Sequence, residues 1–172
     1  MIYDRFCDLL LKYNRIHKLT GAKTKDDVMF FVQDSLYPFE KLDGVKSVLD
    51  VGTGAGFPGM VLAIKYPEVE FTLVEPLQKR VAFLYLVKSS YGLQNVTIIQ
   101  DRVEDVEPFE VDMITSKAVS SAEFLMSITK EFHHDKLRFL LYKGEKVYEE
   151  TKDLKNYEII QNGKANYLVI RM

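Results

Sequence analysis

The chain has few of the features that mark secreted, membrane-spanning or multidomain proteins. It contains one cysteine among 172 residues, Cys7, so no disulfide can form within the chain. Its N-terminus lacks the charged, apolar and small-residue order of a secretory signal, and we expect a cytoplasmic location. The longest uninterrupted apolar run, Val81 to Val87, is far shorter than the ~20 residues of a membrane-spanning helix. The sequence also lacks internal repeats, low-complexity tracts and linkers, which favours one folded core.

Charge is distributed unevenly, although the net charge of −2 by itself neither favours nor excludes a nucleic-acid partner. Between Leu9 and Lys25 there are cations but no acidic residues. Apolar residues at helical spacing accompany them and predict an amphipathic helix, with its apolar face formed by Ile2, Phe6, Leu9, Leu10, Tyr13 and Ile16. Most charged faces of this kind are simply solvated, but Lys12, Arg15 and Lys18 are also candidates for contacts with RNA phosphates.

From Lys46 onward, short apolar strands alternate with segments of helical character. This order predicts a mostly parallel sheet with helices on both faces. The expected strands are 47–51, 71–74, 96–99, 111–115 and 139–142, with helices that begin at Pro58, Leu77 and Ala118. Two more strands, 157–161 and 167–171, flank a hairpin signal at Asn162-Gly163.

An antiparallel hairpin that closes a parallel sheet is the layout of class I methyltransferases, which use S-adenosylmethionine. We therefore predict a Rossmann-like α/β fold with a seven-stranded sheet for residues 45–172. Residues 1–44 are expected to form an N-terminal helical extension, with its second helix at about 26–39. We expect this extension to form part of an RNA-binding face.

The strongest indication of a ligand site is the stretch SVLDVGTGAGFPGM, which begins at Ser47. A buried strand that ends in Asp50 and runs into a glycine-rich turn is typical of sites for nucleotide-like cofactors. The turn glycines, which let the backbone approach a ligand, are Gly52, Gly54 and Gly56. A G-x-G-x-x-G match within this turn raises the possibility of a dinucleotide. Asp50 would repel a pyrophosphate but attract an ammonium or sulfonium group, so we expect S-adenosylmethionine as the cofactor.

Acidic residues follow the next two expected strands. Glu75 ends the second strand, where it is placed to accept hydrogen bonds from both ribose hydroxyls of an adenosine. The third strand is followed by Asp101, Arg102, Val103 and Glu104, which are expected beside the adenine. A solvated loop acid is an alternative role for Glu104, and Arg102 is expected to pair with one of its acidic neighbours.

Whole motifs of the sequence closely resemble the RsmG (GidB) family of bacterial methyltransferases. The most specific string is LDVGTGAGFPGMVLAIKYPEVEFTLVEPLQKRVAFLYLV, followed in the family's order by DRVED, ITSKAVSSAEFL and LYKG. YNRIHKLTG and QDSLYPF resemble the family's N-terminal signature. The resemblance covers nearly the whole chain and implies methylation of N7 of a guanosine in 16S ribosomal RNA. The implied partner is 16S ribosomal RNA or the 30S subunit, without DNA or membrane, and we expect a monomer.

The resemblance also implies cofactor contacts at Gly52, Phe57, Val103, Glu104 and Lys117. Three positions depart from the family's usual pattern. Lys117 stands where the family usually has arginine, Lys18 replaces an asparagine, and Phe31 replaces a histidine. Lysine keeps the charge of arginine but lacks its planar fork. Lys117 is nevertheless our candidate catalytic residue, as a cation that orients the guanine or the cofactor.

This chemistry needs alignment more than a general base, because guanine N7 carries its own lone pair. The sequence offers no strong base, and Cys7 is expected to pack as a small apolar residue. His133 and His134 lack further ligands at metal-binding spacing, so no metal is expected. For Lys143-Gly144, helix capping by the glycine and an RNA phosphate contact by Lys143 are both open.

Two other functions remain open at this point. A small-molecule methyltransferase would use the same fold and cofactor. A non-catalytic S-adenosylmethionine sensor or ribosome assembly factor would bind the cofactor without transferring its methyl group.

Overall fold

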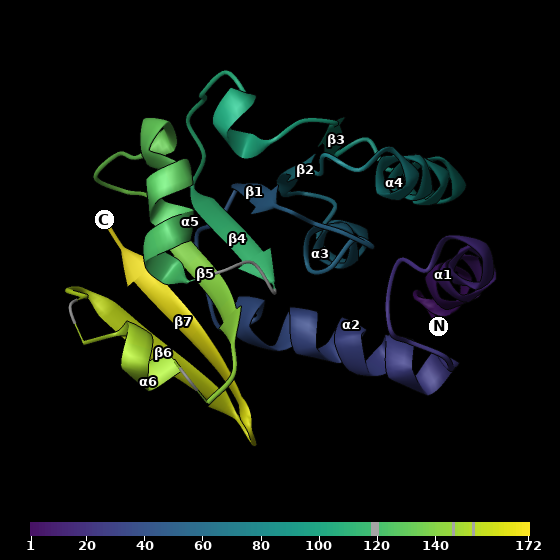
Figure 1. The fold of residues 1–172 in the computed structure, drawn as a ribbon, viewed down its shortest axis with the longest axis horizontal. Helices are drawn as coiled ribbons and strands as arrows, with labels where there is room; N and C mark the ends of the chain where they lie inside the picture. The colour runs from purple at the N-terminus through teal and green to yellow at the C-terminus, as the bar shows by residue number, and fades with distance from the viewer. Residues whose placement is uncertain (118–120, 146, 153) are drawn as a thin grey trace.

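A seven-stranded sheet with helices on both faces forms the molecule (Figure 1). The computed structural model describes residues 1–117, 121–145, 147–152 and 154–172. The strands are β1 (Ser47–Val51), β2 (Glu70–Val74), β3 (Val96–Ile99), β4 (Met113–Lys117), β5 (Arg138–Lys143), β6 (Tyr157–Asn162) and β7 (Ala165–Arg171). The α-helices are α1 (Asp4–His17), α2 (Lys25–Phe39), α3 (Gly59–Lys65), α4 (Gln78–Tyr91), α5 (Ala122–Ile128) and α6 (Val147–Glu150), with short 3₁₀ helices at Val103–Asp105 and Lys130–Phe132.

The strand order confirms the predicted sheet. It runs β3-β2-β1-β4-β5-β7-β6, with β1 to β5 parallel and β7 antiparallel to both of its neighbours. The closing hairpin forms at the predicted place, since Asn162 pairs with Ala165 across the loop. Gly163 has φ +58°, a conformation that glycine adopts readily and that two-residue hairpin loops require.

Strand β4 differs from the prediction, because it covers Met113–Lys117 instead of 111–115. The Asp112 side chain fixes this start by accepting hydrogen bonds from the backbone N–H groups of Lys46 and Ser47, at 2.7 and 3.0 Å. Lys117 is therefore the last residue of the strand, not a residue after it. The predicted helix start at Ala118 lies outside the described residues, and α5 is described from Ala122.

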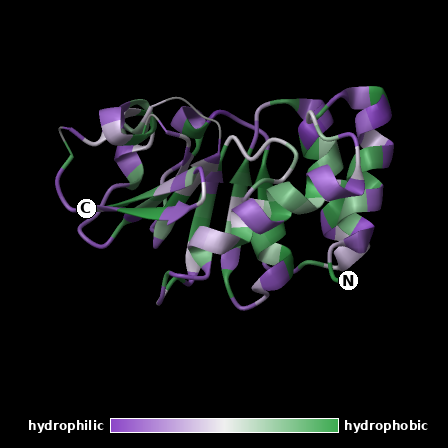
Figure 2. Cartoon of the chain, turned by 90° about the horizontal axis from the view of Figure 1, so that it is seen from below, coloured by the Kyte–Doolittle hydropathy of each residue, from purple (hydrophilic) through white to green (hydrophobic). Residues whose placement is uncertain are grey.

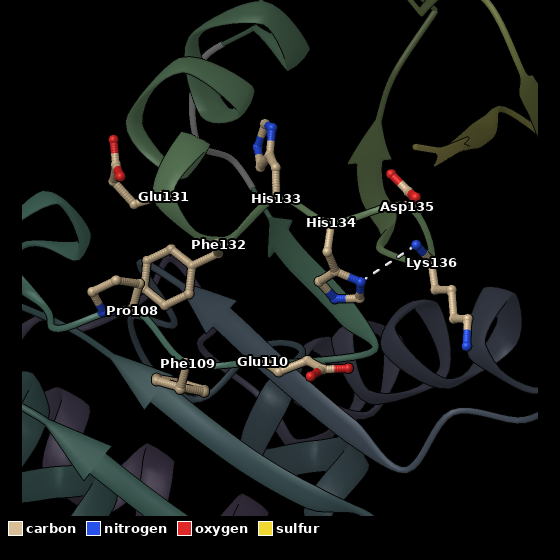
Figure 3. Close-up of a pocket in the computed structure, with 9 residues that line it drawn as sticks. All are labelled: Pro108, Phe109, Glu110, Glu131, Phe132, His133, His134, Asp135 and Lys136. Carbon is tan, nitrogen blue, oxygen red and sulfur yellow. Dashed lines mark hydrogen bonds between the residues drawn. The ribbon is translucent and has the colours of Figure 1, made fainter.

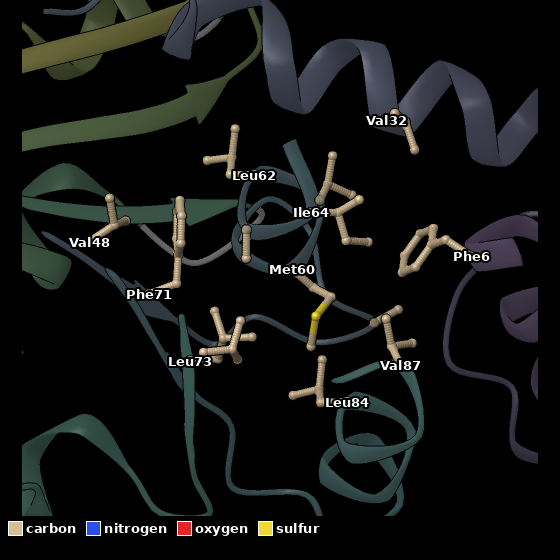
Figure 4. Close-up of a cluster of buried hydrophobic side chains, with 14 of the residues drawn as sticks. Phe6, Val32, Val48, Met60, Leu62, Ile64, Phe71, Leu73, Leu84 and Val87 are labelled. Atoms are coloured by element: carbon tan, nitrogen blue, oxygen red, sulfur yellow. The ribbon is translucent and has the colours of Figure 1, made fainter. Parts of the chain in front are cut away.

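Alternate residues of each strand point to two separate apolar clusters, the first of which is drawn in Figure 4. One cluster joins a sheet face to α1, α2, α3 and α4, and includes Val48, Phe71 and Met60. The other joins the opposite face to α5 and α6. Figure 2 shows the strands as mainly hydrophobic and the helices as a mixture of hydrophilic and hydrophobic residues. The period of two along each strand therefore decides which side chains meet α2.

The N-terminal helices belong to the same apolar cluster as the sheet face that they cover. Phe6 and Leu10 of α1 are fully buried, and Cys7 is buried beside them, as its expected apolar role requires. The predicted apolar face was wrong at its two ends, because Ile2 and Ile16 are 52% and 77% exposed. Within the described ranges, no helix is long and apolar enough to cross a membrane.

Candidate functional site

A cavity of about 640 Å³ opens where β1, β2 and β4 end. This is the edge at which open parallel sheets bind ligands, and the volume suits a small-molecule site. The α1–α2 loop and α2 close it from the N-terminal side. The cavity is lined by Leu19, Thr20, Phe31, Gly52, Thr53, Gly54, Ala55, Phe57, Glu75, Pro76, Leu77, Arg80 and Lys117.

The glycine turn forms one wall, and two of its three glycines face the cavity. Gly52 and Gly54 have φ +68° and +59°, and the Gly52 N–H donates to the Val74 carbonyl at 2.9 Å, which holds the turn against β2. Gly56 does not line the cavity. A Cβ added to Gly56 would lie 2.7 Å from Met60 Cβ, so this glycine permits the close packing of α3 against the turn.

Asp50 lies beneath the turn and does not line the cavity. Its side chain is fully buried, and its Oδ2 atom accepts a hydrogen bond from the Gly59 N–H at 2.8 Å, at the start of α3. Burial raises the pKa of this carboxyl from 3.8 to about 7, an effect that the Gly59 N–H only partly offsets. The expected direct attraction between Asp50 and the cofactor has no support in this placement. The carboxyl instead connects the strand to the following helix.

Glu75 is in the cavity wall, as predicted, but most of its acceptor capacity is in use. Its Oε2 atom accepts from Gly54 N–H at 3.0 Å and from Arg80 at 3.3 Å, and its Oε1 atom accepts from Leu77 N–H at 3.0 Å. A carboxylate has about four lone-pair sites, so one on Oε1 is left for a ligand hydroxyl. To bind both ribose hydroxyls, Glu75 has to give up its 3.3 Å contact with Arg80, so that a hydroxyl can donate to Oε2 in place of Arg80.

Val103 and Glu104 lie in a 3₁₀ helix after β3 and are not in the cavity wall. Val103 is buried in the second apolar cluster. Glu104 is exposed and pairs with Arg102 at 2.9 Å, which lowers the pKa of the Glu104 carboxyl. The predicted local pairing of Arg102 is confirmed. The implied cofactor contacts of Val103 and Glu104 stay predictions.

Lys117 lies in the cavity at the end of a row of side chains that crosses three strands. Lys117 pairs in register with Tyr142 of β5, and Tyr142 with Tyr167 of β7, so all three face α2. Asp34 of α2 spans the row, because its Oδ2 atom is 2.6 Å from Lys117 Nζ and its Oδ1 atom accepts from Tyr167 Oη at 2.7 Å. Burial raises the pKa of both tyrosine hydroxyls, so both act as donors.

Three aromatic rings surround the Lys117 ammonium. Its Nζ atom lies 5.2 Å from the Phe31 centroid and 5.6 Å from those of Phe57 and Tyr142. Such distances allow cation–π attraction, which is stronger for a partly desolvated cation, and the Lys117 side chain is only 19% exposed. Phe31 and Phe57 also contact each other, edge to face, at 5.6 Å. The substitution of phenylalanine at position 31 therefore places an aromatic face beside this lysine.

Sequence reasoning did not assign a role to Asp34, Tyr142 or Tyr167. The available signal was the period of two along β4, β5 and β7, which puts Lys117 and both tyrosines on one sheet face once the register is known. The α2 register then decides which helix residue meets them. Neither quantity follows from residue spacing within one segment.

The predicted RNA contacts occupy different environments. Lys12, Arg15 and Lys18 are exposed at the end of α1 and the start of the loop that reaches the cavity. Lys143 is not a surface cation, because its side chain is 10% exposed and pairs with Glu150 at 2.9 Å. Its predicted contact with RNA phosphate is not supported by this geometry.

A second cavity, of about 520 Å³, lies far from this chemistry (Figure 3). Its walls, from Pro108 to Glu110 and from Glu131 to Lys136, precede β4 and β5 and so lie at the amino edge of the sheet. His134 Nε2 is 2.9 Å from the Val111 carbonyl oxygen and His134 Nδ1 accepts from the Lys136 N–H at 3.3 Å, which together suit a neutral ring protonated on Nε2. Among the described residues, no cluster suitable for a metal ion is found.

Comparisons with known proteins match almost the whole chain. Residues 2–170 match the GidB family model, described as rRNA small subunit methyltransferase G. The chain belongs to this family. A protein from Aliarcobacter butzleri named ribosomal RNA small subunit methyltransferase G is 40% identical over 168 residues, which is 96% of this chain and 87% of that protein. Relatives of the same name in Wolinella succinogenes and Helicobacter pylori are 43% and 44% identical, over 96% and 94% of this chain and 86% and 91% of their own lengths.

Solved structures with low sequence identity share the fold. A putative S-adenosylmethionine-dependent methyltransferase from Methanococcus maripaludis has a TM-score of 0.66 at 10% identity and covers 99% of this chain and 94% of its own. A SAM-dependent methyltransferase from Aquifex aeolicus has a TM-score of 0.62 at 18% identity, over 79% and 87% of the two chains. This chain therefore has the fold of S-adenosylmethionine-dependent methyltransferases.

Proposed function

We propose that this protein transfers a methyl group from S-adenosylmethionine to N7 of a guanosine in small-subunit ribosomal RNA. The observation that carries the proposal is the position of Lys117, which brings a cation into the cavity beside the glycine turn. Membership of the GidB family and the names of the relatives support ribosomal RNA as the substrate. The choice of N7, the cytoplasmic location and the monomeric state are parts of the proposal.

The volume and the lining residues of the cavity support S-adenosylmethionine as its ligand. Gly52 and Gly54 present backbone without side chains, and Glu75 is a carboxylate with 1% exposure that keeps one acceptor site on Oε1. Phe57 and Leu77 add apolar surface for an adenosine or a methionine side chain. When bound, S-adenosylmethionine supplies an electrophilic methyl group on a positively charged sulfur.

The residues of this chain align and shield the reaction. Lys117 is held at one position by Asp34 and by the surrounding rings, so its ammonium group is placed to donate to guanine O6, which lies next to N7. Among the described lining residues we assign no general base, because Glu75 already accepts three donors and guanine N7 has no proton to remove. Phe31 and Leu19 help to exclude water from the cavity.

The direct test maps N7-methylguanosine in 16S ribosomal RNA from cells with and without this gene. Purified protein is then added to 30S subunits, and separately to deproteinised 16S RNA, both from the cells that lack the gene. We expect one guanosine to become methylated in at least one of these substrates. Tight S-adenosylmethionine binding without methyl transfer to either substrate would favour a non-catalytic cofactor-binding protein instead.

A small-molecule methyltransferase is distinguished by the exposed cations of α1. Neutralising Lys12, Arg15 and Lys18 together is expected to weaken RNA binding and flatten its dependence on salt. Turnover of a small substrate would be unaffected by this triple variant. Unchanged RNA affinity in the triple variant would show that α1 is not part of the RNA-binding face.

A further inference from the structure

A third cavity, of about 240 Å³, lies on the other side of the Lys117–Asp34 ion pair from the cofactor cavity. It is formed between α2 and the β6–β7 hairpin, and its lining residues are Phe30, Gln33, Asp34, Asn162, Lys164, Ala165 and Tyr167. Asn166, next to this hairpin loop, pairs with Lys143 at the end of β5. The cavity is therefore at the carboxyl edge of the sheet, the same edge as the site of methyl transfer.

The groups around this cavity match the chemistry of an unpaired nucleobase. Phe30 lines the cavity and is 65% exposed, so its ring is accessible to a planar partner, and it makes an edge contact with Phe31 at 6.0 Å. Gln33 and Asn162 are exposed amides that can both donate to and accept from a base edge. Single-stranded RNA is recognised in this way, by stacking on an aromatic face and by hydrogen bonds to base edges.

The charged residues of the cavity indicate where a base and where a phosphate could bind. Asp34 is on the inner side, where its carboxylate is already paired with Lys117 and Tyr167, so an anion gains nothing there. Lys164 is an exposed cation in the hairpin loop. A nucleotide that places its base against Phe30 and its phosphate near Lys164 satisfies both features.

The geometry points to this cavity as the binding site for an unpaired base of the RNA substrate, adjacent to the guanosine that is methylated. The inference rests on the proposed function, since it concerns the same RNA. The base bound here is not the reacting one, because Asp34 and Lys117 separate the two cavities. A base anchored here would fix the position of the neighbouring guanosine relative to Lys117.

The test compares Phe30→Ala with Phe30→Tyr and with Phe109→Ala. Phe109 is a matched control, because it is 38% exposed and lines the cavity at the amino edge. With 30S subunits or 16S RNA as substrate, Phe30→Ala is expected to raise the KM for RNA about tenfold, which is within the usual effect of removing a stacked ring. S-adenosylmethionine affinity is expected to stay unchanged. Phe30→Tyr and Phe109→Ala are expected to behave like wild type.

A second pair of variants tests the phosphate contact. Lys164→Ala is expected to lower the slope of log affinity against log salt by about 1, whereas Lys136→Ala, at the amino-edge cavity, leaves it unchanged. RNA KM values within twofold of wild type for both Phe30→Ala and Lys164→Ala would overturn the inference. So would saturable binding of free guanosine or adenosine monophosphate that is lost in Phe30→Ala while RNA kinetics are normal. Failure of the proposed function is recognised separately, because wild-type protein would then methylate neither substrate.

Discussion

Replacing Asp50 by asparagine tests how the glycine turn is held in place. The pKa of the buried carboxyl is raised from 3.8 to about 7, chiefly by burial and to a smaller extent by Glu75. The unfolded chain therefore loses this proton at lower pH than the folded chain. The free energy of unfolding should fall as pH rises from about 4 to about 7, by at most roughly 4 kcal/mol, and the contribution should be constant above that range.

The Asp50→Asn variant has no such proton, so its advantage over wild type should grow with pH. Between pH 5 and pH 8 we expect the difference in unfolding free energy to change by roughly 2–3 kcal/mol in favour of the variant. The amide oxygen still accepts from the Gly59 N–H, and any cost of burying the amide NH₂ group is independent of pH. Urea unfolding at several pH values measures the difference, and groups common to both proteins cancel.

Two results would refute this reasoning. A difference that stays constant from pH 5 to pH 8 would show that Asp50 has an ordinary pKa in the folded protein. A tenfold or greater loss of S-adenosylmethionine affinity in Asp50→Asn would show that the carboxylate acts on the cofactor, as its position next to the turn suggested from sequence. We expect the affinity to change by less than about threefold, because Asp50 is not in the cavity wall.

Three other predictions have definite expected outcomes. Gly52→Ala should weaken S-adenosylmethionine binding in calorimetry and lower stability by roughly 1–2 kcal/mol, because Gly52 has φ +68°. The control Gly44→Ala, with φ +69° and open space around it, should lose a similar amount of stability but bind the cofactor normally. Lys18→Asn should raise the unfolding free energy by roughly 0.5–1 kcal/mol, because Lys18 ends α1 at φ 49°, and should weaken RNA binding at low salt by removing a cation. Lys117→Met combined with Asp34→Asn, which avoids an unpaired carboxylate, should lower the single-turnover methylation rate much more than cofactor affinity, and Lys117→Arg should remain active. A wild-type rate in the double variant would exclude Lys117 from catalysis.

The fold followed from sequence because its signals are local. Each parallel strand is a short apolar run, and Gly163 marks the hairpin loop within a few residues of its strands. The error at β4 arose from a contact between distant segments. Asp112 binds the backbone of Lys46 and Ser47, and no pattern within residues 105–117 contains that information.

The site was only partly predictable for the same physical reason. Gly52, Gly54 and Glu75 were found because a glycine turn and a strand-terminal acid have fixed places at the sheet edge. The direction in which a side chain points is a separate question. Asp50 is the second-last residue of β1, Lys117 is the last residue of β4, and both lie on the same face of the sheet. The Asp50 carboxyl nevertheless bonds to the Gly59 N–H beneath the glycine turn, whereas Lys117 lines the cavity.

The helical extension contributes charge as well as surface to the site. Under the proposed function, the cavity has to accept a sulfonium, and Lys117 alone would place an uncompensated cation beside it. Coulomb repulsion between like charges is strong where water is excluded. Asp34 of α2, 2.6 Å from Lys117 Nζ, neutralises that charge, while Tyr167 fixes the carboxylate from the other side. The pair can therefore present an ammonium donor to a base without repelling the cofactor. Because Asp34 comes from residues 25–39 and Lys117 from β4, this balance exists only when the extension is packed on the sheet.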